Sequence, residues 1–210
     1  MEFVFVVERD DIFPGFYPHG FLSLEDNREI FTDMDLSMLG GGFFVERSMA
    51  ERRIDWKQII PYTVLRKGDD VWVMTRGRSG GEPRLYDMLY IGIGGHINPF
   101  DAVAGEEYYS PWKIAACREF SEEAVVTLAG EKMHFGTSDF SRIGLINDDT
   151  NPVGAVHLGL VYEVVVPDRV KVQTEDEGHW VHVDDLDDLE TGELETWTHL
   201  VAKFLCSERQ

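Results

Sequence analysis

The most constraining feature of this chain is the run Arg-Glu-Phe-Ser-Glu-Glu at residues 118–123, which spaces three carboxylates at i, i+3 and i+4. At about 100° per residue, Glu119, Glu122 and Glu123 share one face of a helix. The opposite face is apolar and carries Ile114, Cys117, Phe120, Ala124 and Val125. An amphipathic helix of this kind packs its apolar side against a sheet or another helix and exposes its acids.

Three acids on one helical face need compensating positive charge. Like charges at this spacing repel by about 0.2–0.5 kcal/mol per pair, and Arg118 alone cannot balance three of them. Mg²⁺ prefers oxygen ligands and keeps coordination positions for water and phosphate, so a hard divalent cation is the natural partner. The alternative is an acidic patch that is simply solvated.

The composition bounds the class of protein. The chain has 210 residues, 43% of them hydrophobic, which suits one globular domain with an extension or two small domains. Its 19 basic and 39 acidic residues give a formal net charge of −20, which disfavours nucleic acid polymers and anionic membranes as partners. Only Cys117 and Cys206 are present, without CxxC spacing, so we expect a reducing, cytoplasmic location and no zinc site.

The pattern of elements predicts an α/β protein. Residues 1–54 form an N-terminal extension with a strand at 3–7, and Gly40-Gly41-Gly42 is the best candidate for a linker. Residues 55–210 form the main domain, with a last helix spaced by apolar residues between Leu194 and Leu205. The acidic helix begins at Pro111 after an N-cap at Ser110 and ends between 127 and 130. The expected strands are 59–65, 71–75, 85–93, 140–147, 154–166 and 179–183.

The acidic helix, together with Gly94-Gly95-His96 before it, resembles the Nudix (MutT-type) hydrolase motif, G-x5-E-x7-R-E-U-x-E-E-x-G-U with U aliphatic. The resemblance extends to Gln-Ile-Ile-Pro-Tyr at 58–62 and Val-His-Leu-Gly at 156–159, which look like a subgroup of MutT-like phosphoesterases. It covers roughly residues 55–205. It implies a Nudix-type α/β/α sandwich with a mixed sheet, here with an N-terminal extension.

Three departures from the family pattern stand out. Ser110 occupies the position of the motif glutamate when the motif is counted back from Arg118, and Val125 replaces the motif glycine. The stretch between Gly95 and Arg118 is also about nine residues too long, and we place the extra residues in a loop at 99–109. Glu106 or Glu107 in that loop is a candidate for the displaced carboxylate, with a solvated loop acid as the equal alternative.

By resemblance, the chain is a pyrophosphohydrolase that uses Mg²⁺ or Mn²⁺ on a small nucleoside diphosphate derivative. Glu119, Glu122 and Glu123 would hold the metal, and Arg118 would orient a carboxylate. Candidate general bases are a helix glutamate such as Glu122, or one of the acids at 175–177, of which Glu177 is our choice. Gly94, Gly95 and His96 would contact the diphosphate.

The arginines at 76–84 and the aromatic residues near the inserted loop could serve either function or structure. Arg76, Arg78 and Arg84 form a basic cluster in an acidic chain, and Arg84 is our candidate for gripping phosphate, although exposed loop arginines are common. Aromatic residues near the inserted loop are more often packing residues than ligands. His157 alternates with apolar neighbours, which favours a core or near-core position.

Two competing functions remain open. A Nudix-fold domain that senses a nucleotide without cleaving it would explain the losses at Ser110 and Val125. A diphosphate isomerase would need a reactive cysteine in the pocket, whereas Cys117 lies opposite the acids. The substrate, the role of residues 1–54 and a homo-oligomeric state are left open by the sequence.

Overall fold

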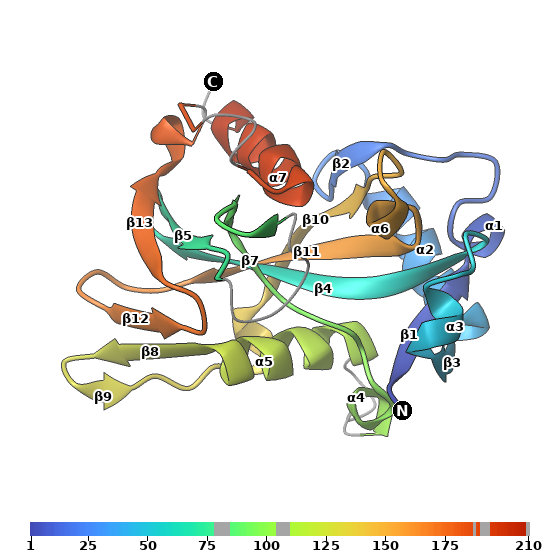
Figure 1. Ribbon diagram of the computed structural model, residues 1–210, viewed down its shortest axis with the longest axis horizontal. Helices are drawn as coiled ribbons and strands as arrows, with labels where there is room; N and C mark the ends of the chain where they lie inside the picture. Colours follow the sequence, from blue (N-terminus) through green and yellow to red (C-terminus); the bar gives the residue numbers. More distant parts are fainter. Residues whose placement is uncertain (78–84, 104–109, 187, 190–193, 209–210) are drawn as a thin grey trace.

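The computed structural model describes residues 1–77, 85–103, 110–186, 188–189 and 194–208 (Figure 1). Its helices are α1 (Arg9–Ile12), α2 (Arg28–Gly41), α3 (Arg47–Ala50), α4 (Pro99–Val103), α5 (Pro111–Glu123), α6 (Pro152–Ala155) and α7 (Thr196–Ser207), with 3₁₀ turns at Thr137–Asp139 and Val183–Asp185. Its strands are β1 (Phe3–Glu8), β2 (Gly20–Ser23), β3 (Phe43–Glu46), β4 (Trp56–Lys67), β5 (Asp70–Thr75), β6 (Leu89–Tyr90), β7 (Gly92–Ile93), β8 (Ala124–Leu128), β9 (Glu131–Lys132), β10 (Ser141–Asn147), β11 (His157–Val165), β12 (Lys171–Thr174) and β13 (Gly178–His182).

A mixed sheet forms the centre of the molecule. Its strands follow the order β13-β5-β4-β11-β10-β2, and β1, β3, β6 and β7 pair at its sides. The two middle strands, β4 and β11, run parallel from Gln58 opposite His157 to Arg66 opposite Val165. Parallel strands are normally covered on both faces, so helices are expected above and below this pair.

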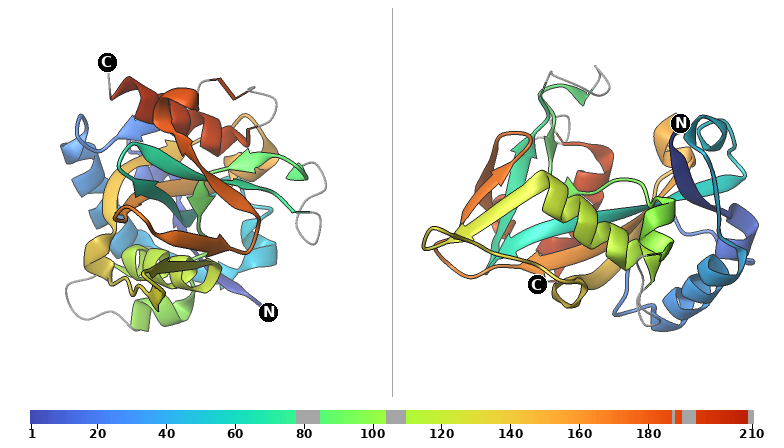
Figure 2. Two further views of the ribbon diagram at one scale, coloured as in Figure 1. Left: turned by 90° about the vertical axis from the view of Figure 1, so that its left-hand side faces the viewer. Right: turned by 90° about the horizontal axis from the view of Figure 1, so that it is seen from below.

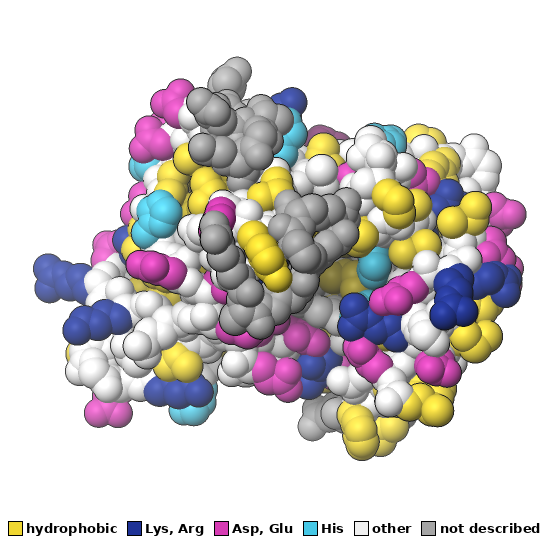
Figure 3. All heavy atoms as spheres, viewed as in Figure 1, with side chains coloured by type: hydrophobic (Ala, Val, Ile, Leu, Met, Phe, Trp, Pro, Cys, Tyr) yellow, Lys and Arg dark blue, Asp and Glu magenta, His cyan; other side chains and the backbone are white. Residues whose placement is uncertain are grey.

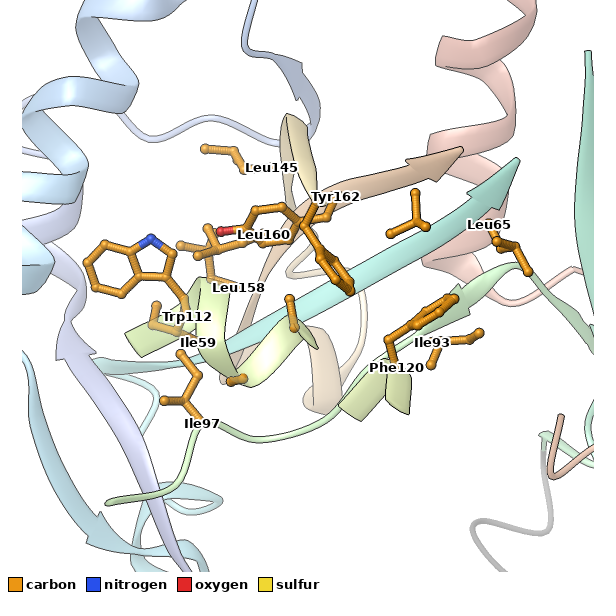
Figure 4. Packing of buried hydrophobic residues seen from close by; sticks show 14 of the residues in the cluster. Ile59, Leu65, Ile93, Ile97, Trp112, Phe120, Leu145, Leu158, Leu160 and Tyr162 are labelled. Atoms are coloured by element: carbon orange, nitrogen blue, oxygen red, sulfur yellow. The ribbon is translucent and has the colours of Figure 1, made fainter. Parts of the chain in front are cut away.

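The alternation of side chains along β4 explains the layers. Ile59 and Leu65 belong to the core on the α5 side, whereas Tyr62 and Val64 belong to the core on the α7 side. Figure 1 shows α5 and α7 on opposite sides of β4, and Figure 4 shows Phe120 of α5 among the buried side chains of β4 and β11. The α/β/α sandwich with a mixed sheet is therefore confirmed.

The acidic helix is shorter than the sequence pattern predicted. It ends at Glu123, and Ala124 begins β8, so the expected end between 127 and 130 was wrong. Val125, Val126 and Thr127 are β-branched and pair with β12, which favours a strand over further helical turns. The buried side of α5 also differs from the expected one, because it consists of Trp112, Ala115, Ala116 and Phe120.

The N-terminal segment is built into the main sheet. Strand β1 pairs with β3 and with the start of β4, and β2 pairs with β10. In two perpendicular views, β1, α2 and α3 gather at one end of the molecule (Figures 1 and 2). Gly40 and Gly41 form the last residues of α2 rather than a linker. The division into an extension and a hydrolase domain stays a prediction.

Most of the other expected elements are present. The hairpin of β4 and β5, the strands β10, β11 and β13 and the last helix α7 match their predicted ranges within a few residues. The expected strand at 85–93 is reduced to β6 and β7, which pair with different neighbours. In the part of the chain that the structure describes, none of the helices has the length and apolar character needed to cross a membrane.

Candidate active site

The segment after β7 brings the double glycine against the acidic helix. A Cβ atom on Gly95 would lie 2.7 Å from both carboxylate oxygens of Glu119, and one on Gly94 would lie 1.8 Å from the carbonyl oxygen of Pro61. Both contacts are far inside the normal separation of such atoms. At Gly94 the obstacle is backbone, so only glycine fits, whereas at Gly95 a side chain would force the Glu119 carboxylate to move. The backbone of the predicted diphosphate-binding segment therefore lies directly on a predicted metal ligand.

Arg118 is held by a fork of hydrogen bonds. Its Nε and Nη2 atoms donate to the two carboxylate oxygens of Asp101 at 2.8 and 2.9 Å, and Nη2 also donates to the carbonyl oxygen of His96. Its Nη1 atom donates to Glu119 Oε1 at 2.7 Å and to Glu122 Oε2 at 3.3 Å. The Asp101 side chain is only 2% exposed, so this bidentate pair fastens α4 to α5.

Asp101 is the residue that sequence reasoning missed. Counted forward from Gly95, the motif position G-x5-E falls on Asp101, whereas counting back from Arg118 falls on Ser110. The extra residues therefore lie between Asp101 and Arg118, and α4 occupies the beginning of the expected loop. The spacing from Gly95 was the available signal. Glu106 and Glu107, the earlier candidates, lie outside the described residues.

The three helix acids have different environments. Glu119 is largely buried, and burial raises its pKa although Arg118 opposes the shift. Burial also raises the pKa of Glu123 to about 7, with further contributions from the negative charges of Glu119, Glu175 and Glu122. Glu122 is 60% exposed at its side chain. The acids therefore repel one another around Glu123, and Arg118 compensates only part of this charge.

The chemistry of this group suits a hard divalent cation, but its side chains are not yet arranged as ligands. Among the described residues, no three histidine, cysteine, aspartate or glutamate side chains are grouped closely enough to hold an ion. Arg118 takes up Oε1 of Glu119 and, at 3.3 Å, Oε2 of the exposed Glu122. The donors are all carboxylate oxygens, which is the set that Mg²⁺ and Mn²⁺ prefer.

A cavity of about 760 Å³ opens beside the double glycine. Its lining includes Gly94, Gly95 and His96 from one side and Trp197 of α7 from the other, with residues 150–157 closing a third side. Figure 3 shows acidic and basic side chains side by side over α5, below a hollow that contains hydrophobic and histidine side chains. A volume of this size accommodates a small organic ligand.

Two histidines face each other in this cavity. The His96 and His157 rings lie 5.7 Å apart, and His96 Nε2 lies 3.0 Å from Gln58 Oε1. Burial lowers the pKa of His96 to about 4, with a further contribution from Arg47, and burial also lowers the pKa of His157. Both imidazoles are therefore neutral near pH 7. His157 lines the cavity, so the near-core position expected from the sequence is at the cavity wall.

Arg76 and Asp176 are both engaged in contacts within the protein. Arg76 donates from Nε and Nη2 to Glu195 Oε1 and lies over the ring of Tyr90, so its charge is already compensated. Asp176 accepts hydrogen bonds from the Tyr90 hydroxyl and the Gly77 N–H. Arg84 and Arg78 lie outside the described residues.

The candidate general bases at 175–177 lie between β12 and β13. Of these, Glu175 adds to the charge that raises the pKa of Glu123. The side chain of Glu177 is exposed, and its carbonyl oxygen accepts the Thr75 N–H. The catalytic roles of Glu177 and Glu175 stay predictions, and of the three acids Glu175 is the one whose charge acts on Glu123.

Comparison with known proteins agrees with this geometry. No family model matches the chain. Protein YmaB of Bacillus subtilis (strain 168) is 32% identical over 214 residues, which span 97% of each protein. The crystal structure of Tm1382, described as a candidate Nudix hydrolase, is 28% identical with a TM-score of 0.74 and covers 99% of this chain and all of its own. A NUDIX hydrolase from Alicyclobacillus acidocaldarius shares the fold at a TM-score of 0.50 and 19% identity, over 72% of this chain and 91% of its own. The chain therefore shares the fold of the Nudix (MutT-type) hydrolases, in agreement with the resemblance of its acidic helix to their motif.

Proposed function

We propose that this protein is a Mg²⁺- or Mn²⁺-dependent hydrolase that cleaves the pyrophosphate linkage of a small nucleoside diphosphate derivative. The observation that carries the proposal is the position of Gly95, which lies against Glu119 and at the same time lines the cavity. The backbone at Gly95 thus separates the cavity from the helix acids. A diphosphate bound at Gly95 would lie between a ligand body in the cavity and the carboxylates of α5.

Each residue of the site has a proposed role. Glu119, Glu122 and Glu123 would hold the cation, which neutralises phosphate charge and lowers the pKa of bound water. Arg118, fixed by Asp101, holds the carboxylate of Glu119 in place. His96, which is neutral, offers a hydrogen bond without adding charge to the cavity.

The candidates for the general base are Glu123 and the acids near it. A general base works best when its pKa lies near the working pH, and Glu123 has a pKa of about 7 when no cation is bound. A bound cation would lower the pKa of each acid that holds it. Glu175 and Glu177 are then the favoured proton acceptors, and Glu122 is a candidate only if it does not bind the cation. Glutamine variants at these positions separate the candidates, because the loss of the base removes one limb of the pH–rate profile.

The direct test is a substrate panel. Nucleoside diphosphate sugars, nucleoside triphosphates and dinucleoside polyphosphates are incubated with Mg²⁺, Mn²⁺ or EDTA, and phosphate-containing products are measured. We expect at least one compound to be cleaved only with metal, and Glu119→Gln and Glu123→Gln to lower kcat/KM by about 10²–10⁴-fold.

The matched control is Glu131→Gln, an exposed acid on β9 whose loss should leave turnover unchanged. Tight binding of a nucleotide without product under any metal would instead support the sensing domain. Asp101 weakens the sensing alternative, because it restores a carboxylate partner for Arg118 that Ser110 does not provide.

A further inference from the structure

Lys57, in the second position of β4, is completely buried. Its Nζ atom donates to Asp149 Oδ1 at 2.7 Å and to the carbonyl oxygens of Gly154 and His157 at 2.9 and 3.1 Å. Three acceptors satisfy all three donors of an ammonium group, which is rarely buried without such partners. Burial lowers the pKa of Lys57 to about 8, while the negative charge of Asp149 opposes that shift.

The N-terminal segment binds the second carboxylate oxygen of Asp149. Asp149 Oδ2 accepts hydrogen bonds from Arg9 Nη1 at 2.9 Å and from the Tyr17 hydroxyl at 2.8 Å. Arg9 Nη2 also donates to the carbonyl oxygen of Ala155 at 2.6 Å. Residues 148–157 are therefore clamped between β4 on one side and residues 9–17 on the other. We call this set of contacts the Lys57 clamp.

The clamped segment is a wall of the cavity. Thr150, Asn151, Val153, Gly154 and His157 all line it. Asn151 Oδ1 accepts the N–H groups of Val153 and Gly154, and a side chain on Gly154 would collide with the carbonyl oxygen of Asp148. Local contacts thus shape the wall. The Lys57 clamp adds three side-chain hydrogen bonds from β4 to the backbone bond that the Gln58 N–H donates to the Val156 carbonyl oxygen, and His19 of the N-terminal segment lies 3.6 Å from Asp148.

A contact within the wall sets the hydrogen-bonding character of His157. Its Nδ1 atom lies 2.7 Å from the carbonyl oxygen of Val153, which can only accept, so Nδ1 carries the proton. Nε2 is then an acceptor, because the imidazole is neutral. The backbone carbonyls of Gly154 and His157, on either side of this turn, are both held by Lys57.

We propose that Lys57 is a positioning residue that holds the cavity wall at 148–157 in its ligand-binding shape, with Arg9 and Tyr17 as the outer half of the clamp. The N-terminal segment therefore contributes to ligand affinity without touching the helix acids. Removal of the ammonium leaves two carbonyl oxygens and one carboxylate oxygen without this donor, and the wall loses these three hydrogen bonds to β4 while the backbone bond from Gln58 to Val156 remains. The identity of the ligand, but not the clamp, rests on the proposed function.

The first test needs no ligand and no metal. In hydrogen exchange, Lys57→Met should speed exchange of the amides at 153–157 by about tenfold or more, while the amides of α5 keep their protection. Lys67→Met, at a half-buried lysine on the same strand that pairs with Asp70 at the opposite end of β4, is the matched control and should change neither region. Unchanged protection at 153–157 in Lys57→Met would overturn the proposal.

A milder variant covers the case in which Lys57→Met does not fold. Tyr17→Phe removes one hydrogen bond to Asp149 and keeps the ring, so exchange at 153–157 should rise about threefold to tenfold, the equivalent of one hydrogen bond. If exchange at 153–157 in Tyr17→Phe equals that of the wild type, Tyr17 does not help to hold the wall, and the proposed outer half of the clamp is wrong.

A kinetic test links the clamp to function. With the compound that is cleaved best, Tyr17→Phe should raise KM several-fold and change kcat by less than about twofold, because the wall binds the ligand and not the reacting phosphorus. A fall in kcat at unchanged KM would overturn this role. If no compound is cleaved by the wild-type protein, the proposed function fails, while the exchange experiment still decides on the clamp.

Discussion

Gly95 lines the cavity and lies against Glu119 of the acidic helix. An added methyl group would lie 2.7 Å from the carboxylate of Glu119, so that side chain must move. A displacement of about 1 Å in a catalytic group costs on the order of 10² in rate. The effect of substituting Gly95 therefore measures how far activity depends on the position of Glu119.

We expect Gly95→Ala to lower kcat/KM of metal-dependent hydrolysis by about 10²-fold or more and to leave a folded protein. Gly40→Ala is the control, because Gly40 lies in α2 with nothing within 4 Å of an added Cβ atom. That substitution should raise the free energy of unfolding by about 0.5–1 kcal/mol without affecting turnover. Wild-type activity in Gly95→Ala would show that Glu119 tolerates displacement.

His96 should make the fold sensitive to mild acid. Its pKa is about 4 in the folded protein, through burial and the nearby charges of Arg47 and His157 against the opposing Glu2, and about 6.5 when unfolded. Between these values the unfolded chain binds more protons, so stability present above pH 6.5 is lost as the pH falls toward 4.

Urea unfolding at pH 4.5 and pH 7 measures this contribution. We expect the difference in unfolding free energy between the two pH values to shrink by on the order of 1–2 kcal/mol in His96→Gln, compared with the wild type. His134 is exposed and does not line the cavity, so His134→Gln is the control. We expect this variant to leave the difference in unfolding free energy between the two pH values unchanged. An unchanged difference in His96→Gln would mean that another group causes the acid sensitivity.

The ion pair of Asp101 and Arg118 joins elements α4 and α5. Asp101 is buried, and its two oxygens accept both bonds of the Arg118 fork. Loss of one partner leaves a charged guanidinium without its main acceptor in a partly buried site. The loss would also disturb the positions of Glu119 and Glu122, because both accept hydrogen bonds from Arg118.

Asp101→Asn is therefore expected to cost about 2–4 kcal/mol of unfolding free energy and to lower hydrolysis. Denaturant titration gives the first quantity and the substrate panel the second. Asp55→Asn breaks a surface pair with Arg53 and should change neither. A stability loss in Asp101→Asn no larger than that of the control would show that the α4–α5 contact does not depend on this pair.

At the scale of the whole molecule, the N-terminal segment and the main sheet share strands and core. Phe5 packs 6.4 Å from the Trp112 ring of α5, and Val6 and Val7 pair with Gln58 and Lys57 of β4. The cavity draws on both parts, since Arg47 and residues 94–96 line it together.

Deletion of residues 1–46 should accordingly remove cooperative unfolding, because it exposes the edge of β4 and the apolar surface under β1. Thermal unfolding followed by circular dichroism and size-exclusion chromatography measure the outcome. A fragment of residues 47–210 that stays monomeric and unfolds cooperatively near the wild-type temperature would support the predicted division at residue 54.

The sequence by itself determined the α/β class, the main strands, the acidic face of α5 and the family resemblance, because periodicity and motif spacing are local properties of the chain. The sequence prediction missed Asp101, although the spacing from Gly95 pointed to it, and the fold places that residue beside Arg118. It also extended α5 into β8, whose strand state depends on pairing with β12. The tertiary structure alone decided the cavity, the neutral histidine pair and the Lys57 clamp. Each of these depends on contacts between residues distant in the chain, where burial and hydrogen bonding outweigh local preference.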